Sequence, residues 1–386
     1  MTIYTRTFPE QCAEAHPGLV KEMNGASVRG FHPAKIGFDT EMLLQRPPTA
    51  VGAITPFVDQ GLFDFVEECA GSVVPRAFNF QDAPQAQGPR PVLGAPDGTK
   101  ICIFALGIMN RFPIRDVDAD HLWYVYSGSG ICYTDLGWFE FEAGDFVYVP
   151  RSILSHFESN NALAETAILI GVQSQKDLLL RTSGPFENRD VPFSQFAMKT
   201  PQPYKLAGPR LTTIRVRRGG KLTQIEYVSN PLTCVAWKGT TYPFAVSTKD
   251  LHLPYVTSEH PDPTNFAVFA TADLSVVISV LGPRFVHSIP YYHLNKWDEF
   301  LFYARGYDAR KGSMGGVGEA GTATLHPQGI WHGPQPEAME QAKAPMAPQE
   351  MPWVKDLAVM IESRSPLNLC EGGRNLLIPD YEHSWL

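Results

Sequence analysis

The twelve residues from Gly321 to His332, Gly-Thr-Ala-Thr-Leu-His-Pro-Gln-Gly-Ile-Trp-His, carry the strongest structural signal in this 386-residue chain. Pro327 follows Gly321 by six residues, Gly329 comes two residues later, and His332 ends the pattern after three more. Proline and glycine at this spacing favour a tight turn between two short strands. The pattern therefore predicts a strand, a turn and a returning strand whose His332 points into the mouth of a β-barrel.

A second pattern lies upstream and begins with His293. Glu299 follows His293 by six residues, and Gly306 follows Glu299 by seven. The two patterns together resemble the paired motifs of cupin barrels, although Asn295 stands where a second histidine is usual. His293, Glu299 and His332 would supply two imidazoles and one carboxylate, a set that holds non-haem Fe(II) and leaves positions open for substrate and O2. Mn and Zn accept the same ligands, so the residues alone leave the metal open.

The chain contains a faint internal repeat. The segment His121–Gly128 resembles Glu299–Gly306, at an offset of 178 residues. Each segment is followed by a further glycine, with a proline six residues after it. Because an internal repeat fixes the architecture, this one predicts an all-β fold, a tandem double cupin of two β-barrel or jelly-roll domains.

The first copy lacks the ligand set. At the positions of the three candidate ligands it has Arg115, His121 and Ser155, while His156 lies one residue out of register. A slip of one residue along a strand turns a side chain to the opposite face. We therefore expect the first barrel to be structural and to have lost its metal site.

Short aromatic and β-branched runs recur at intervals near ten residues from Lys100 onward, which is typical of a sandwich or barrel. A proline-rich stretch from about 183 to 208 separates them into two groups. We expect an irregular N-terminal segment over 1–95 with one helix at 62–69, an N-terminal cupin-like barrel over 96–205, and a C-terminal catalytic cupin barrel over 206–386. Strands are expected at Ile101–Leu106, Leu122–Tyr126, Trp138–Phe141, Phe146–Val149, Thr166–Val172, Thr212–Val216, Ile225–Val228, Phe266–Ala270, Leu274–Leu281, Glu299–Ala304 and Leu357–Ile361.

Composition and charge argue against several classes of function. The chain is 44% apolar and carries a net charge of −8, so it has a core but no nucleic-acid footprint. Its one basic run is interpreted as a solvated strand end. No uncharged apolar run reaches the roughly 18 residues of a membrane helix, and no signal pattern opens the chain, so we expect a cytoplasmic protein. Six scattered cysteines predict free, mostly buried thiols. The basic run comprises Arg215, Arg217, Arg218 and Lys221.

Several strings after residue 230 are similar to those of the homogentisate 1,2-dioxygenase family, and the resemblance is faint before that point. It implies a bicupin that opens the ring of a hydroquinone acid using Fe(II) and O2, and that assembles into trimers paired as hexamers. The strings are Cys234–Gly239, Glu259–Pro263, Pro290–His293, Glu299–Phe300, Arg305–Gly306, His332–Pro334, Ile361–Ser363 and Tyr381–Trp385.

The resemblance also implies roles for individual residues. It places Fe(II) on the three candidate ligands, in agreement with their spacing. His260 would be the catalytic acid/base, and His326 would be a catalytic histidine beside the ligands. The substrate would contact His332 and Tyr307. In this chain Tyr307 directly follows an Arg-Gly pair, so it either takes the role of the family's substrate-binding tyrosine or the contact is lost.

The predicted reaction converts homogentisate to maleylacetoacetate in the catabolism of tyrosine and phenylalanine. The substrate would bind as a phenolate after His260 takes its proton. Aromatic residues near the ligands would either wall the substrate ring or pack in the core. These are Tyr291, Tyr292, Trp297 and Trp331.

Two alternatives stay open. The first is a related dioxygenase for another para-diphenol, such as gentisate or a substituted hydroquinone. Glu299 argues against gentisate dioxygenases, which resemble this architecture but use three histidines. The second is a bicupin without dioxygenase activity, namely an isomerase or a protein that binds a sugar or a metal.

Overall fold

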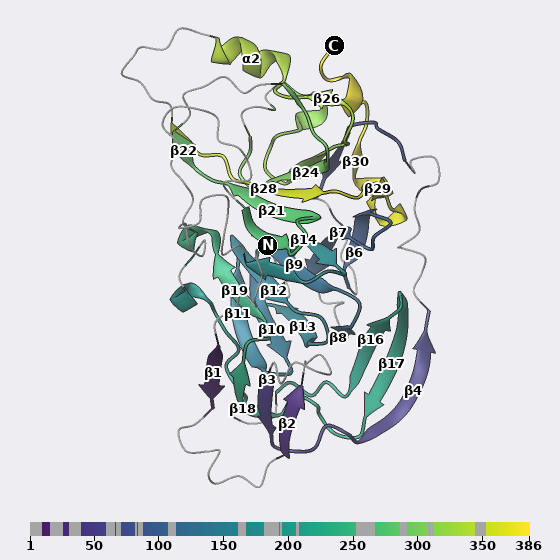
Figure 1. Cartoon of the computed structure of the whole chain (residues 1–386), viewed down its shortest axis with the longest axis vertical. Coiled ribbons are helices and arrows are strands. Elements are labelled where there is room, and N and C mark those ends of the chain that lie inside the picture. Colours follow the sequence, from purple (N-terminus) through teal and green to yellow (C-terminus); the bar gives the residue numbers. More distant parts are fainter. Residues whose placement is uncertain are drawn as a thin grey trace.

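The computed structural model shows strands arranged in two stacked bodies, the first coloured blue to teal and the second green to yellow (Figure 1). The fold-class prediction of an all-β chain is confirmed. The residues that the structure describes are 10–15, 26–30, 40–58, 66, 71–81, 83, 88–106, 113–160, 167–180, 193, 195–205, 208–251, 267–285, 292–307, 310, 312–343 and 353–386.

The first barrel is built from two sheets of seven strands each. One sheet has the order β19 (Phe244–Ser247), β12 (Asp145–Val149), β9 (Asp120–Ser127), β14 (Ala167–Ser174), β7 (Lys100–Leu106), β6 (Arg90–Gly94) and β29 (Asn368–Leu369). The other has the order β11 (Gly137–Glu142), β10 (Ser129–Thr134), β13 (Leu154–Ser159), β8 (Ile114–Asp116), β16 (Thr213–Arg218), β17 (Lys221–Tyr227) and β4 (Val51–Phe57).

The second barrel combines one long sheet with two short pairs of strands. The long sheet has the order β15 (Leu178–Leu180), β20 (Ala267–Thr271), β21 (Val276–Leu281), β28 (Ala358–Ser363), β24 (Asp298–Tyr303), β25 (Thr322–His326), β5 (Arg76–Asn79) and β30 (Leu377–Ile378). The short pairs are β22 (Arg284–Phe285) with β27 (Trp353–Val354), and β23 (His293–Leu294) with β26 (Trp331–His332).

The two barrels pair their strands by one scheme. In the first, β9 lies between β12 and β14, β14 continues to β7, and β8 pairs with β13. In the second, β24 lies between β25 and β28, β28 continues to β21, and β23 pairs with β26. All these pairs are antiparallel. The internal repeat seen in the sequence is therefore a repeat of topology, as expected for a double cupin.

The barrels share one continuous core because the sheet of the first barrel that contains β9 faces the long sheet of the second. Tyr126 meets Phe302 edge to face at 5.2 Å between ring centres, and Phe146 approaches Phe269 at 6.0 Å. The central strands β14, β21 and β24 are buried along their whole length. A strand buried on both faces needs a continuous apolar run, and these three strands carry such runs.

The glycines shared by the two repeats lie in turns that require them. Gly144 and Gly321, at matching positions, have φ angles of 94° and 85°, a region that favours glycine. A Cβ atom at Gly321 would also lie 2.8 Å from the hydroxyl of Tyr126 in the other barrel. The shared spacing of the repeat thus reflects a turn in both barrels, and Gly321 also lies at a close contact between them.

The opening segment contributes strands to several sheets. β4, β5 and β6 extend the sheets of the barrels, and a further sheet has the order β1 (Gln11–Glu14), β18 (Cys234–Gly239), β3 (Thr40–Leu44) and β2 (Ala26–Gly30). The described residues of segment 1–95 therefore include strands, whereas the sequence predicted an irregular segment. These strands are stabilised by hydrogen bonds to partner strands far along the chain. The helix expected at 62–69 lies outside the described residues apart from Val66.

Strand pairing also bears on the predicted boundary near residue 205. β16, β17 and β19 pair with strands of the first barrel or of the opening segment, whereas β15 pairs with β20 of the second. This pairing favours a boundary between β19 and β20.

The described helices are short: α2 (Pro336–Ala342) and the 3-10 helices η2 (Gln195–Ala197), η3 (Thr248–Asp250), η6 (Met314–Gly316), η7 (Glu371–Leu376) and η8 (Tyr381–His383).

The cysteines within the described residues are free, as predicted. Cys102 and Cys234 are buried, and burial raises the pKa of each thiol to about 12. Such thiols are inert at neutral pH. Within the same residues no helix is long and apolar enough to cross a membrane.

Candidate metal centre

The three predicted ligands meet at one end of the second barrel. His293 on β23 and His332 on β26 are directly paired across the strands, and Glu299 lies at the start of β24. Glu299 Oε2 is 3.7 Å from His293 Nε2 and 3.8 Å from His332 Nε2. Glu299 and His332 are buried, whereas the side chain of His293 is 35% exposed. The cluster is therefore open to solvent on the His293 side.

Neighbouring Asp298 explains how the sequence holds this geometry. Its Oδ1 accepts the backbone N–H of Gln328 at 2.9 Å, and its Oδ2 accepts that of Leu367 at 2.7 Å. The first bond ties the start of β24 to the turn that contains Pro327 and Gly329. A buried aspartate thus links the two motifs and sets the ligands they carry side by side.

The arrangement fits a divalent metal ion. The candidate ligand atoms of His293, Glu299 and His332 all lie within 4.8 Å of one another, and no other such cluster occurs among the described residues. Two ligands about 2.1 Å from one ion lie roughly 3.0 Å apart at right angles and ~3.4 Å apart in a tetrahedron. The two separations between Glu299 Oε2 and the imidazole nitrogens, 3.7 and 3.8 Å, are a few tenths of an ångström above the tetrahedral spacing.

Glu299 is held as a carboxylate. Burial alone would raise its pKa, but the neighbouring imidazoles of His293, His326 and His332 keep the pKa well below its ordinary value. Asn295 contributes as well, since its Nδ2 donates to Glu299 Oε2 at 2.9 Å. An ionised carboxylate between neutral imidazoles is the state that binds a metal cation.

His326 lies behind Glu299 and is completely buried. Its Nδ1 is 3.3 Å from Glu299 Oε1, its Nε2 is 3.1 Å from the hydroxyl of Tyr381, and its ring stacks on that of His332 at 4.4 Å. Burial and the nearby charge of Arg310 lower the pKa of His326 to about 3, so the ring is neutral. The structure therefore brings His326 to the centre, in contact with a ligand and away from solvent.

Tyr307 does not join the cluster. Its ring stacks on Tyr303 at 5.4 Å with an interplanar angle of 15°. Tyr303 stands four residues after Glu299 on β24, a distance of roughly 13 Å along a strand. The other predicted catalytic residue, His260, lies outside the described residues.

Three residues near the centre were given no functional role from the sequence. Tyr381 contacts His326, and Asn295 contacts Glu299. Arg310 is buried, donates from Nε to the Tyr303 hydroxyl at 2.9 Å and from Nη1 to the carbonyl of Gly333, beside ligand His332. Tyr381 stands inside a string already noted as similar to a known family, and Asn295 stands two residues after another such string, at the position where a second histidine is usual. These are the signals that point to them.

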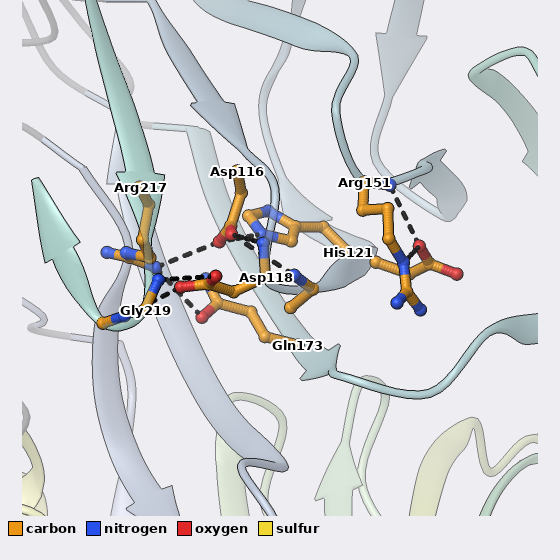
Figure 2. Close-up of polar contacts among 10 residues, drawn as sticks. Asp116, Asp118, His121, Arg151, Gln173, Arg217 and Gly219 are labelled. Atoms are coloured by element: carbon orange, nitrogen blue, oxygen red, sulfur yellow. Dashed lines mark hydrogen bonds and ion pairs between the residues drawn. The ribbon is translucent and has the colours of Figure 1, made fainter. Parts of the chain in front are cut away.

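The corresponding position in the first barrel holds an ion-pair network (Figure 2). His121 Nε2 lies 2.9 Å from Asp116 Oδ2, and Arg217 Nη1 lies 3.2 Å from the same oxygen and 3.3 Å from Gln173 Oε1. Burial would raise the pKa of Asp116, but His121 and Arg217 lower it to about 2. A guanidinium group thus takes up the charge of the Asp116 carboxylate where the second barrel gathers three candidate ligands.

Arg217 belongs to the basic run that ends β16 and begins β17. Arg215 and Arg217 are both buried, and the guanidinium of Arg215 lies 3.8 Å from the centre of the Phe57 ring. These two arginines serve internal contacts and do not form a basic surface stripe. The run is therefore neither a nucleic-acid footprint nor the fully solvated strand end that the sequence predicted.

Comparison with known proteins gives a consistent result. Residues 251–386 match the family described as homogentisate 1,2-dioxygenase C-terminal. A protein of Saccharolobus solfataricus whose name describes it as a candidate dioxygenase is 29% identical over 288 residues, which cover 70% of this chain and 69% of the relative. The homogentisate 1,2-dioxygenase of Rhodopseudomonas palustris strain BisA53 is 30% identical over 191 residues.

The match to the second of these relatives covers 45% of this chain and 41% of that protein, so the chain aligns with about two fifths of the homogentisate dioxygenase's length.

Among solved structures, a cupin 2 conserved barrel domain protein from Leptotrichia buccalis has a TM-score of 0.36 and 10% identity. That similarity covers 78% of this chain and 98% of the other. The sequence matches confirm the family resemblance inferred from the motifs.

Proposed function

We propose that this chain, a divergent relative of the homogentisate 1,2-dioxygenases, is an Fe(II)-dependent dioxygenase that opens the ring of a hydroquinone acid. The observation that carries the proposal is the cluster of His293, Glu299 and His332, which lies within the residues that match the family. Two imidazoles and one carboxylate with open positions are the ligand set of non-haem Fe(II) oxygenases.

Bound there, Fe(II) would supply Lewis-acid and one-electron chemistry toward O2 and the substrate. The remaining functions fall to the chain. Glu299 is held ionised by the surrounding imidazoles, and the exposed edge of His293 marks the side from which substrate would enter. His260 is our candidate for the base that takes the phenol proton, since a phenolate is the better ligand and electron donor.

Homogentisate is the first candidate substrate, with maleylacetoacetate as product in tyrosine and phenylalanine catabolism. The support is the family match, because it includes all three proposed ligands. A second candidate is another para-diphenol with a different side chain, such as gentisate or a substituted hydroquinone. The stacking of Tyr307 on Tyr303, away from the cluster, favours a substrate whose tail is received by other residues. The assembly of this chain into a trimer or a hexamer remains a prediction.

Oxygen uptake tests the proposed function directly. Purified protein is loaded anaerobically with Fe(II) and mixed with homogentisate, gentisate, hydroquinone or catechol, and O2 consumption and ring-opened product are measured. We expect consumption of one O2 per molecule of homogentisate or of a related para-diphenol acid. Absence of uptake with every diphenol, or a strong preference for catechol, would contradict the proposal.

A further inference from the structure

The two carboxylate oxygens of Glu299 lie in different surroundings. Oε2 faces the cluster, 3.7 Å from His293 Nε2 and 3.8 Å from His332 Nε2. Oε1 faces the barrel interior, 3.3 Å from His326 Nδ1. One oxygen is therefore available to a metal ion and the other is bonded to a buried histidine.

The direction of the hydrogen bonds follows from proton counting. A carboxylate that ligates a metal is deprotonated and can only accept hydrogen bonds. Nδ1 of His326 must therefore carry a hydrogen, and this N–H donates to Glu299 Oε1. A second proton on His326 would bury another positive charge beside a metal ion and beside Arg310, which is strongly unfavourable. His326 Nε2 is then an acceptor, and the hydroxyl of Tyr381, 3.1 Å away, is the group that donates to it.

Tyr381 is itself firmly held. It lies in η8 near the C-terminus, completely buried, with its ring against Trp385 at 5.3 Å. Ser384 Oγ donates to its carbonyl at 2.7 Å and accepts a bond from Gln335 Nε2 at 3.3 Å. Gln335 follows the ligand His332 by three residues, so the C-terminal turn is tied to the segment that carries a ligand.

We propose that Tyr381 is a positioning residue for the metal centre. Its hydroxyl donates to His326 and selects the Nδ1–H tautomer, which bonds Glu299 Oε1 and turns Oε2 toward His293 and His332. The C-terminal segment thus orients a ligand that it does not touch. The inference rests on the proposed function, in that it takes the cluster to bind a divalent metal.

The first test compares two buried tyrosines, one beside the cluster and one in the first barrel. Tyr381→Phe removes the donor to His326, whereas Tyr204→Phe removes a buried hydroxyl that donates to the carbonyl of Thr134. Co(II) affinity of each metal-free protein is measured by titration of its visible absorption, and stability by thermal unfolding without metal. We expect a loss of Co(II) affinity of about tenfold in Tyr381→Phe, the lower limit for direct partners of metal ligands because Tyr381 acts through His326, and less than a threefold change in Tyr204→Phe.

Equal Co(II) affinities for wild type and Tyr381→Phe would overturn the inference while leaving the proposed function intact. Equal losses in both phenylalanine variants would also overturn it, because they would reveal a general packing effect. If the wild-type protein binds no Co(II) or Fe(II), the proposed function fails, and the inference fails with it.

A second test addresses the tautomer without relying on metal. The ¹⁵N chemical shifts of His326 in the metal-free protein distinguish Nδ1–H from Nε2–H, and we expect Nδ1–H in the wild type and a mixture in Tyr381→Phe. In a His326→Asn background, whose amide keeps a donor toward Glu299, Tyr381→Phe should cause no further loss of Co(II) affinity. An Nε2–H tautomer in the wild type, or additive losses in the double variant, would overturn the inference.

Discussion

In the second barrel Glu299 lies opposite His326 on the neighbouring strand, whereas in the first barrel His121 takes the same position opposite Val149. The residue that precedes Glu299 and the residue that precedes His121 are both aspartates. Asp298 and Asp120 are both buried, and each accepts two backbone N–H groups from matching segments of its barrel.

The aspartates fix the start of the central strand in both barrels, irrespective of any metal. The residue that follows differs: it is a carboxylate among imidazoles in one barrel, and an imidazole bonded to Asp116 and its partner Arg217 in the other. The contacts that fix the strand therefore reside in other side chains than the candidate ligands, so both barrels have the same strand pairing although only the second gathers the candidate ligands.

The largest expected effect comes from removing the carboxylate. Glu299→Gln keeps the shape of the side chain but removes the negative charge that the cluster offers to a cation. We expect loss of bound iron and a fall in O2 uptake of more than about 100-fold, beyond the range for residues that only support a ligand. Metal analysis and oxygen-electrode assays check this, and a variant with near-normal iron would contradict the ligand assignment.

The matched pair Asp120→Ala and Asp298→Ala tests the shared structural role. Each change strands one buried and one partly buried N–H group that were bonded to a charged oxygen, a loss of about 1.5–3 kcal/mol per bond. Asp120→Ala also removes the acceptor of the Tyr148 hydroxyl and of the Arg151 guanidinium. Denaturant unfolding of the metal-free proteins should show destabilisation of roughly 3 kcal/mol or more in both, with the larger loss in Asp120→Ala. Only Asp298→Ala should also weaken Co(II) binding. Metal affinity that falls equally in both variants would contradict the division of roles.

The ion-pair network of the first barrel should leave a signature at acid pH. The folded-state pKa of Asp116 is about 2, below its ordinary value of 3.8, so the folded protein binds this proton more weakly than the unfolded chain. The stabilisation is then fully present above about pH 4 and is lost as the pH falls toward 2. The advantage of wild type over Asp116→Asn in unfolding free energy should shrink by roughly 2 kcal/mol between about pH 5 and pH 2. A constant difference would show that Asp116 is not the titrating group.

A smaller effect is expected at Asn295, whose counterpart in the first barrel is Val117. Asn295→Val removes the bond from Nδ2 to Glu299 Oε2 and gives the second barrel the residue of the first. We expect Co(II) affinity to fall about tenfold, the lower limit for such partners, with iron stoichiometry kept. An unchanged affinity would mean that Asn295 does not help to orient the carboxylate.

The clustering of His293, Glu299 and His332 could be predicted from sequence because it depends on local spacing. Glycine and proline in the segment from Gly321 to His332 dictate a turn, and that turn sets the returning histidine beside the strand that carries Glu299. The same local logic identified the first barrel as altered, since its ligand positions hold other residues.

Contacts between distant segments could not be predicted in this way. Arg217 reaches Asp116 across 101 residues of chain, and Tyr381 reaches His326 across 55. The strands of the opening segment could not be predicted for the same reason, since β5 pairs with β25 and β30 of the second barrel. Pairing of this kind leaves no periodic pattern in the local sequence.

The stoichiometry of bound metal tests the central claim most directly. Wild-type protein and the His293→Ala/His332→Ala double variant are loaded anaerobically with Fe(II), freed of excess metal and analysed for iron per chain. The comparison of the two barrels predicts one iron per chain in the wild type and essentially none in the double variant. Two irons per chain, or iron retained in the double variant, would contradict it.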